Sequence, residues 1–375
     1  MNIFRYNILL FSVLSLMLPV CKLNAQKITL LFAGDAMQHQ SQIDQSFRNG
    51  KYDYSSYFQY VKDEITDADI AIVNLEVTLA GKPYKGYPQF SAPDEYAKAL
   101  QEAGFDVMLN ANNHIVDRGN KGIIRTLSVL DSIKIAHTGV FRNREERESV
   151  YPLIIEKKGV RFAILNYTYG SNGFYASKPV LVNYIDKKQI SEDIQKAKNL
   201  NVDIIIATMH WGEEYKLTQN KEQENLANFM IKEGVDMVIG SHPHVVQPSI
   251  AIVDSVGNIS GLIVYSLGNF VSGMVAPNTE GGQIVKVVLE KQNNKTYLKS
   301  AEYALIYRHK AKYGDKTDFM VIPVSLAEKT DSSDRIVIEM SPDSYIKMEK
   351  FVKNARAVLN KHNENVYEYK LKAPF

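Results

Sequence analysis

The sequence predicts an α/β fold, and three observations support this prediction. Apolar runs of five to eight residues, rich in β-branched side chains, recur along the chain and end in polar residues, as strands buried on both faces do. Segments with helical spacing of apolar residues lie between several of these runs, and such alternation favours an α/β architecture. Beyond Gly281 the pattern changes and predicts further β-structure followed by one terminal helix.

The expected strands all end in polar or turn-forming residues. They are the runs KITLLFAGD, ADIAIVNLE, DVMLNANNH, RFAILNYTY, VDIIIATMHWG, VDMVIGSHPH and GLIVYSLGNF. The expected helices are APDEYAKALQEAGF, NKGIIRTLSVLDSI and KEQENLANFMIKEGV, and the first of these begins after Pro93 and ends at Gly104. Near the C-terminus a hairpin should turn at Asn293–Asn294, FMVIPVS should add a strand, and a last helix should be capped by Ser341.

Length and composition restrict the possible functions. The chain has 375 residues, 45% hydrophobic and 23% charged, which suits one large globular domain or two small ones. The formal net charge of +2 gives no strong field that would attract nucleic acid, so no nucleic-acid partner is expected. No Walker-type phosphate loop is present, so the sequence offers no nucleotide site of a polymerase.

The first 25 residues differ from the rest and are expected to be a secretory signal peptide. Arg5 precedes an apolar run from Ile8 to Val20 that is short for a membrane span, and a plausible cleavage site follows Ala25. The protein is therefore expected to be exported, to the periplasm or attached to the cell envelope. The only cysteine is Cys21, and membrane attachment is expected only if this residue carries a lipid.

Polar residues gather at the carboxyl ends of the expected strands, where open α/β sheets bind their ligands. Each group alone has an ordinary explanation as a turn or a helix cap, but the occurrence of all of them together favours a shared site. The residues are Asp35, Asn74, Glu76, Asn112, Asn113, His114, His210, His242, His244 and Asn269.

The chemistry of this set predicts a divalent metal centre. Carboxylate, amide oxygen and imidazole suit Mn²⁺, Fe²⁺ or Zn²⁺ better than Ca²⁺, and the set lacks the thiolates of a structural zinc site. His242 and His244 are two residues apart, so in an extended segment they would point the same way and bind one ion or two neighbouring ions. Pro243 would stiffen the pair because its φ angle is fixed.

Six motifs, in the order GDAM, NLE, NNHIVDRG, HWGEEY, GSHPHVVQP and YSLGNF, resemble those of the CapA family of capsule (poly-gamma-glutamate) synthesis proteins. The resemblance covers roughly residues 28–275. That family is itself similar to the calcineurin-like metallophosphoesterases, which implies a four-layer α/β/β/α sandwich with a metal centre at one edge. The chain is then expected to comprise the signal peptide at 1–25, a CapA-like domain at 26–330, and a C-terminal helical extension at 331–375 packed on that domain.

The resemblance also implies roles for individual residues. It implies that His114 is the general acid and that the metal ligands are Asp35, Glu76 in place of a bridging aspartate, Asn113, His210, His242 and His244. One departure matters, because the superfamily's first motif is Asp-x-His and this sequence has Met37 at the third position, with His39 two residues further on. The expected centre therefore holds either one ion or two.

Four further residues have alternative roles that the sequence leaves open. Asp117 either orients His114 or is a first-turn helix carboxylate. Glu213 either contacts the substrate or a ligand imidazole, or is a solvated loop acid. Asn74 is a candidate substrate contact, and Asn269 either donates to a substrate oxyanion or caps a turn.

Two functions are consistent with these observations. One is a metal-dependent hydrolase or transferase that acts on an anionic cell-envelope or capsule polymer or a phosphoester. The other is a non-catalytic metal- or polymer-binding accessory protein of capsule synthesis and export, whose partners would belong to that export assembly.

Overall fold

The structure is a computed structural model that describes residues 26–313, 316–328, 338 and 340–371. The expected signal peptide, with Cys21, lies outside the described residues. Within the described ranges, no helix is both long enough and apolar enough to cross a membrane.

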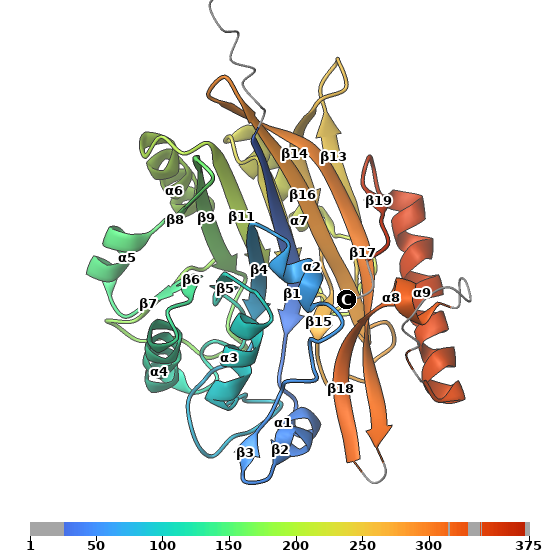
Figure 1. Cartoon of the computed structure of the whole chain (residues 1–375). Coiled ribbons are helices and arrows are strands. Elements are labelled where there is room, and N and C mark those ends of the chain that lie inside the picture. Colours follow the sequence, from blue (N-terminus) through green and yellow to red (C-terminus); the bar gives the residue numbers. More distant parts are fainter. Residues whose placement is uncertain (1–25, 314–315, 329–337, 339, 372–375) are drawn as a thin grey trace, which may run out of the picture.

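Fifteen of the described strands form one hydrogen-bonded sheet that bends into two facing halves (Figure 1). The first half has the order β6 (Ala136–Thr138), β5 (Val107–Leu109), β4 (Ile70–Leu75), β1 (Gln26–Ala36), β16 (Gly281–Gln292) and β17 (Lys295–Tyr313). The second half continues with β14 (Ile259–Val264), β12 (Met237–Ser241), β11 (Ile204–His210), β9 (Val160–Thr168) and β8 (Leu153–Lys157). Four strands pair beside this path: β13 (Ser249–Val253), β15 (Asn269–Val271), β18 (Lys316–Pro323) and β19 (Tyr367–Glu368).

Five of the described helices cover the outer faces of the two halves. All the described helices are α1 (Gln40–Ser46), α2 (Lys62–Thr66), α3 (Asp94–Glu102), α4 (Gly119–Ser132), α5 (Arg144–Val150), α6 (Lys187–Asn199), α7 (Lys221–Lys232), α8 (Val324–Ala327) and α9 (Pro342–His362). Helices α2, α3 and α4 pack on the first half, and α6 and α7 pack on the second. Two small ribbons pair β2 (Phe47–Arg48) with β3 (Lys51–Tyr52), and β7 (Val140–Phe141) with β10 (Leu181–Val182). The expected α/β/β/α sandwich is therefore confirmed.

Strand β1 shows why its sequence is almost continuously apolar. Leu30 and Phe32 face the core between the two halves, whereas Leu31 and Ala33 face the core beneath the helices. Successive side chains of a strand point to opposite faces, so a strand that is covered on both sides needs apolar residues at every position. The same alternation occurs in β11, where Ile204 contributes to the inner core and the next residue to an outer one.

The expected secondary structure agrees with most of these elements. The three internal helices correspond to α3, α4 and α7, and the hairpin turns at Asn293 and Asn294, whose φ angles are 51° and 63°. Positive φ at both central residues is the geometry of a tight hairpin turn, which asparagine tolerates. Helix α6 and the edge strand β8 were not predicted.

The C-terminal segment shares the core of the rest of the chain. Helix α9 is capped by Ser341 as expected, and it buries Met348, Phe351 and Leu359 in the core between the two halves. After the helix, β19 pairs in parallel with β17, and Figure 1 shows α9 lying beside that strand.

The topology brings distant strand ends to one edge of the sandwich. Strands β1, β4 and β5 run parallel in the first half, and β9, β11 and β12 run parallel in the second. Short β15 pairs with the end of β1, which places Asn269 opposite Asp35. Close approach is possible here because Gly34 has no side chain: a Cβ atom on Gly34 would lie 1.9 Å from the carbonyl oxygen of Gly268.

Replacing Gly34 by alanine is expected to destabilise the protein by about 1–3 kcal/mol, because the added methyl group would force β15 away from β1. Urea unfolding followed by circular dichroism measures this free energy. Gly170→Ala is the matched control, since a Cβ atom there meets nothing within 4 Å. Equal stability of the two variants would contradict the close contact.

Candidate metal centre

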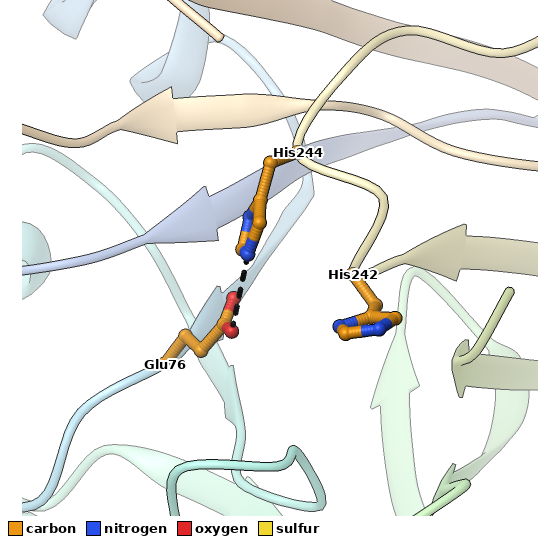
Figure 2. Close-up of side chains that lie close together, drawn as sticks. All are labelled: Glu76, His242 and His244. Atoms are coloured by element: carbon orange, nitrogen blue, oxygen red, sulfur yellow. Dashed lines mark ion pairs between the residues drawn. The ribbon is translucent and has the colours of Figure 1, made fainter. Parts of the chain in front are cut away.

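Two overlapping groups of buried side chains at this edge could hold metal ions. One group is Asp35, Glu76 and His210, and the other is Glu76, His242 and His244. Within each group the potential ligand atoms lie within 4.8 Å of one another. Figure 2 shows the carboxylate of Glu76 and the rings of His242 and His244 turned toward a common space. Because Glu76 belongs to both groups, its carboxylate would contact a cation held by either one.

Glu76 follows the last residue of β4 and is completely buried. Its Oε1 atom lies 3.6 Å from His210 Nε2 and 3.8 Å from His244 Nε2, and it has no hydrogen-bond partner in the described part of the chain. Burial raises the pKa of Glu76 well above its usual value, and the neighbouring charge of Asp35 raises it further. An unpartnered carboxylate oxygen in such a place is costly unless a proton or a cation joins it.

Asp35 is held by three groups from other segments. Asn74 Nδ2 donates to Asp35 Oδ1 at 2.8 Å, and the backbone N–H of His242 donates to Oδ2 at 3.3 Å. His244 Nδ1 lies 3.0 Å from the same Oδ2. Burial alone would raise the pKa of Asp35, but the hydrogen bonds and the imidazole of His244 together lower it. The carboxylate of Asp35 is therefore ionised, and its contacts fix its orientation.

The orientation of His244 follows from its neighbours. Its Nδ1 atom also lies 3.1 Å from Asn269 Oδ1, while Asn269 Nδ2 donates to the carbonyl oxygen of Thr279 at 2.9 Å. Since the nearby atoms of Asp35 and Asn269 are both acceptors, the hydrogen of His244 sits on Nδ1. Its Nε2 atom, which faces Glu76, is then the free electron-pair donor that a metal requires.

His210 and His242 are neutral in this environment. Burial, followed by the neighbouring imidazoles, lowers the pKa of His210 well below its usual value, and burial lowers the pKa of His242 to about 3. His210 Nε2 lies 2.9 Å from Asn113 Oδ1, which can only accept, so in the metal-free protein the hydrogen of His210 is on Nε2 and its electron pair is on Nδ1. His242 Nδ1 is buried without a hydrogen-bond partner among the described residues. Neutral imidazoles suit metal binding because each has one nitrogen electron pair that a cation can accept.

The expectation that His242 and His244 lie in an extended segment is wrong. Strand β12 ends at Ser241, and the two histidines have φ angles of 99° and 59°. Positive φ is strained for residues with a side chain and is found preferentially at functional sites. A turn, and not the alternation of a strand, therefore directs both rings to the centre.

His114 lies beside the metal groups and is paired with Asp117. His114 Nδ1 is 2.9 Å from Asp117 Oδ2, which also accepts the backbone N–H of Phe90 at 2.7 Å. The ring of Phe90 packs edge-on against His114, with centroids 4.6 Å apart. Asp117 thus holds the Nδ1 hydrogen of His114 and leaves Nε2 available for proton transfer, as the orienting alternative for Asp117 predicts.

Other expected residues have different surroundings. Asn74 is buried between Asp35 and His210, so it orients ligands instead of facing a substrate. Asn269 likewise orients His244. Glu213 is exposed and is contacted by Asn220 Nδ2 at 3.5 Å. Its neighbour Glu214 is the acid whose charge helps to raise the pKa of Glu76.

The position of Met37 explains the departure from the Asp-x-His motif. Its side chain is buried in the core beneath the helices of the first half, so this position offers no ligand. His39 does not belong to either candidate group of the described residues; its Nδ1 accepts the backbone N–H of Gly273 at 3.1 Å.

Sequence reasoning missed two residues that adjoin the centre. The ring of Tyr169 lies 4.5 Å from that of His242, and Asn172 Oδ1 accepts a hydrogen bond of 3.2 Å from Asn113. The only available signal was their place at the end of the expected strand RFAILNYTY, where Tyr169 is the last residue and Asn172 follows three residues later.

The fold and the site define an α/β/β/α sandwich protein with a candidate metal centre at the carboxyl ends of its strands. The model of the family described as bacterial capsule synthesis protein PGA_cap matches residues 29–274, and the chain belongs to this family. The resemblance found in the motifs is therefore confirmed.

Curated relatives agree with this assignment. The chain is 30% identical to the capsule biosynthesis protein CapA of Bacillus anthracis over 72% of its own length and 65% of that protein. It is 30% identical to the PGA biosynthesis protein CapA of Bacillus subtilis over 63% of its length and 62% of that protein. The chain thus spans less than two thirds of either relative. The calcineurin-like phosphoesterase YfkN of Bacillus subtilis matches with a TM-score of 0.43 and 12% identity, over 88% of this chain and 98% of that one.

Adding Mn²⁺ or Zn²⁺ to the metal-free protein is expected to release a proton from Glu76, because burial and Asp35 keep its carboxyl protonated until a cation enters. The pKa of Glu76 is raised, so below that pKa each unit of rising pH strengthens the apparent affinity, by up to about tenfold for one proton. Calorimetric titrations at one pH, in two buffers of different ionisation enthalpy, count the protons. Glu76→Gln should release fewer protons than the parent, and an equal count would contradict this protonation state.

Proposed function

We propose that this chain is an exported, metal-dependent hydrolase or transferase that acts on an anionic cell-envelope or capsule polymer or a phosphoester. One observation carries the proposal: the unpartnered, buried oxygen of Glu76 is shared by two groups of ligand-type side chains. Membership of the capsule synthesis family supports a substrate in that pathway.

The residues present fit a divalent metal. Asp35, Glu76 and His210 would hold one ion, and His242 and His244 would hold a second ion with Glu76 as the shared ligand. A bound ion supplies Lewis acidity, which lowers the pKa of water and offsets negative charge on substrate oxygens. The mixed oxygen and nitrogen set suits Mn, Fe or Zn.

The protein's own groups supply proton transfer and orientation. His114 is held by Asp117 through Nδ1, so Nε2 can carry a proton to a leaving group. Phe90 shields one side of the ring, and its backbone N–H keeps Asp117 in place. Asn74 and Asn269 fix the direction of Asp35 and His244, so these ligands need little reorganisation when a substrate binds.

A second function is favoured by the place of Met37. Because that side chain lies in the core, the first-strand motif contributes Asp35 without a neighbouring histidine. An accessory protein could use such a centre to bind polymer carboxylates without cleaving them. Metal-loaded protein that hydrolyses no phosphoester, yet binds poly-gamma-glutamate in a way that a chelator abolishes, would favour this function.

His114→Ala is expected to lower the rate of hydrolysis of a model phosphoester by about 10²–10⁴-fold, since a positioned general acid contributes that much. The metal content should stay unchanged, because His114 does not belong to either ligand group. His362→Ala, an exposed histidine on α9, is the matched control and should keep full activity. Undiminished activity of the His114→Ala protein would remove this residue from the chemistry.

A further inference from the structure

A pocket of about 420 Å³ lies beside the candidate metal centre. It is lined by the loop 169–175, which follows β9, and by Tyr184. None of the residues that have been given a role in metal binding or proton transfer lines this pocket, so it is a separate feature of the same edge.

The loop 169–175 contacts the centre directly. Asn172 Oδ1 accepts a hydrogen bond from Asn113 Nδ2, which leaves Asn113 Oδ1 turned toward His210. Asn172 Nδ2 also lies 3.5 Å from His114 Nδ1. The ring of Tyr169 lies against that of His242. Tyr169 and Asn172 therefore separate the pocket from His242 and His114 by the thickness of one side chain.

Among the described residues, the pocket lining presents aromatic surface and no charged side chain. Phe174 is 41% exposed, Tyr175 is 83% exposed and Tyr169 is 48% exposed. Exposure of such large aromatic side chains to water is unfavourable, and a bound molecule that covered them would remove this cost. The polar groups in the lining come from tyrosine and serine hydroxyls and from the amide of Asn172. Lys178, three residues after Tyr175, does not line the pocket.

The composition of this lining favours an uncharged occupant over an anionic one. A carboxylate or phosphate would find no cation among the described residues that line the pocket, and the negative charge of Glu214 acts on Tyr169 at its edge. Aromatic faces combined with hydroxyl and amide groups suit a ring that has apolar faces and a polar rim. A hexose has both properties.

We propose that this pocket is a sugar-binding subsite, in which an uncharged hexose unit packs on Phe174 and Tyr175 and places its neighbouring bond at the metal ligands. The placement of the bond next to the hexose at the metal ligands rests on the proposed function. The binding of the hexose ring in the pocket does not depend on that function. The substrate would then be a sugar-containing polymer or sugar phosphoester, in which the negative group faces the metal and the neutral ring faces the loop.

Isothermal titration calorimetry with chitotriose, a neutral trimer of N-acetylated hexose units, tests the subsite in the full metal-loaded protein. Saturable binding is expected, and Tyr175→Ala should weaken it about fivefold to tenfold, as the loss of one aromatic contact does. Tyr297→Ala is the matched control, because this tyrosine is 50% exposed on β17 and does not line the pocket. Since Tyr175 is so exposed, its replacement leaves the core intact.

Three results would overturn the proposal: no saturable binding of chitotriose, equal affinity in Tyr175→Ala and the parent protein, or tighter binding of adenosine or tri-gamma-glutamate that depends on Tyr175. Titration of the His114→Ala protein separates this proposal from the catalytic one. Chitotriose should bind that variant with nearly the parent affinity. A parent protein that binds chitotriose but hydrolyses no phosphoester would reject the catalytic proposal alone.

Discussion

Two carboxylates, those of Asp35 and Glu76, are completely buried at one edge of the sheet, and the rest of the site is arranged around their charge. Two negative groups in such a place are costly unless hydrogen bonds, protons or cations compensate them. Asp35 has its compensation from Asn74, His244 and a backbone N–H. Glu76 has an oxygen without a hydrogen-bond partner in the described chain. The imidazoles of His210 and His242 are neutral, so they supply no positive charge to balance an ionised Glu76. A proton on Glu76 satisfies this constraint in the metal-free protein, and a divalent cation would satisfy it in place of that proton.

The fold provides the means to bring these groups together. The two halves of the sheet face each other, so Asn74 of β4 lies within hydrogen-bonding distance of both Asp35 of β1 and His210 of β11. The backbone N–H of His242, just after β12, also donates to Asp35. The turn after β12 holds His242 and His244 at positive φ, a strain that persists only where surrounding contacts fix the backbone. Here the contact of the His242 N–H with Asp35 and the two contacts of His244 Nδ1 provide that fixation. The contacts that hold the strained backbone of this turn are therefore the same contacts that direct His242 and His244 to the site.

Much of the fold was predictable because buried strands and amphipathic helices have strong local patterns, as in IAIVNL of β4 and in α3 and α7. The gathering of Asp35, Glu76, His210 and the two later histidines was also predictable, since polar residues at parallel strand ends share an edge. Their roles as ligands stay a prediction. The orienting contacts of Asn74 and Asn269, the turn at His242 and the contact of Asn172 with Asn113 depend on segments far apart in sequence, so local patterns could not reveal them.

Elemental analysis of the purified protein, after loading with Mn²⁺, Fe²⁺ or Zn²⁺ and removal of free ions, tests the central claim most directly. The proposed metal centre predicts one or two ions per chain, a lower count in His242→Ala, and an unchanged count in His39→Ala, whose histidine lies nearby but outside both ligand groups. A folded protein that retains no ion at saturating concentrations, or equal ion counts in the two histidine variants, would contradict it.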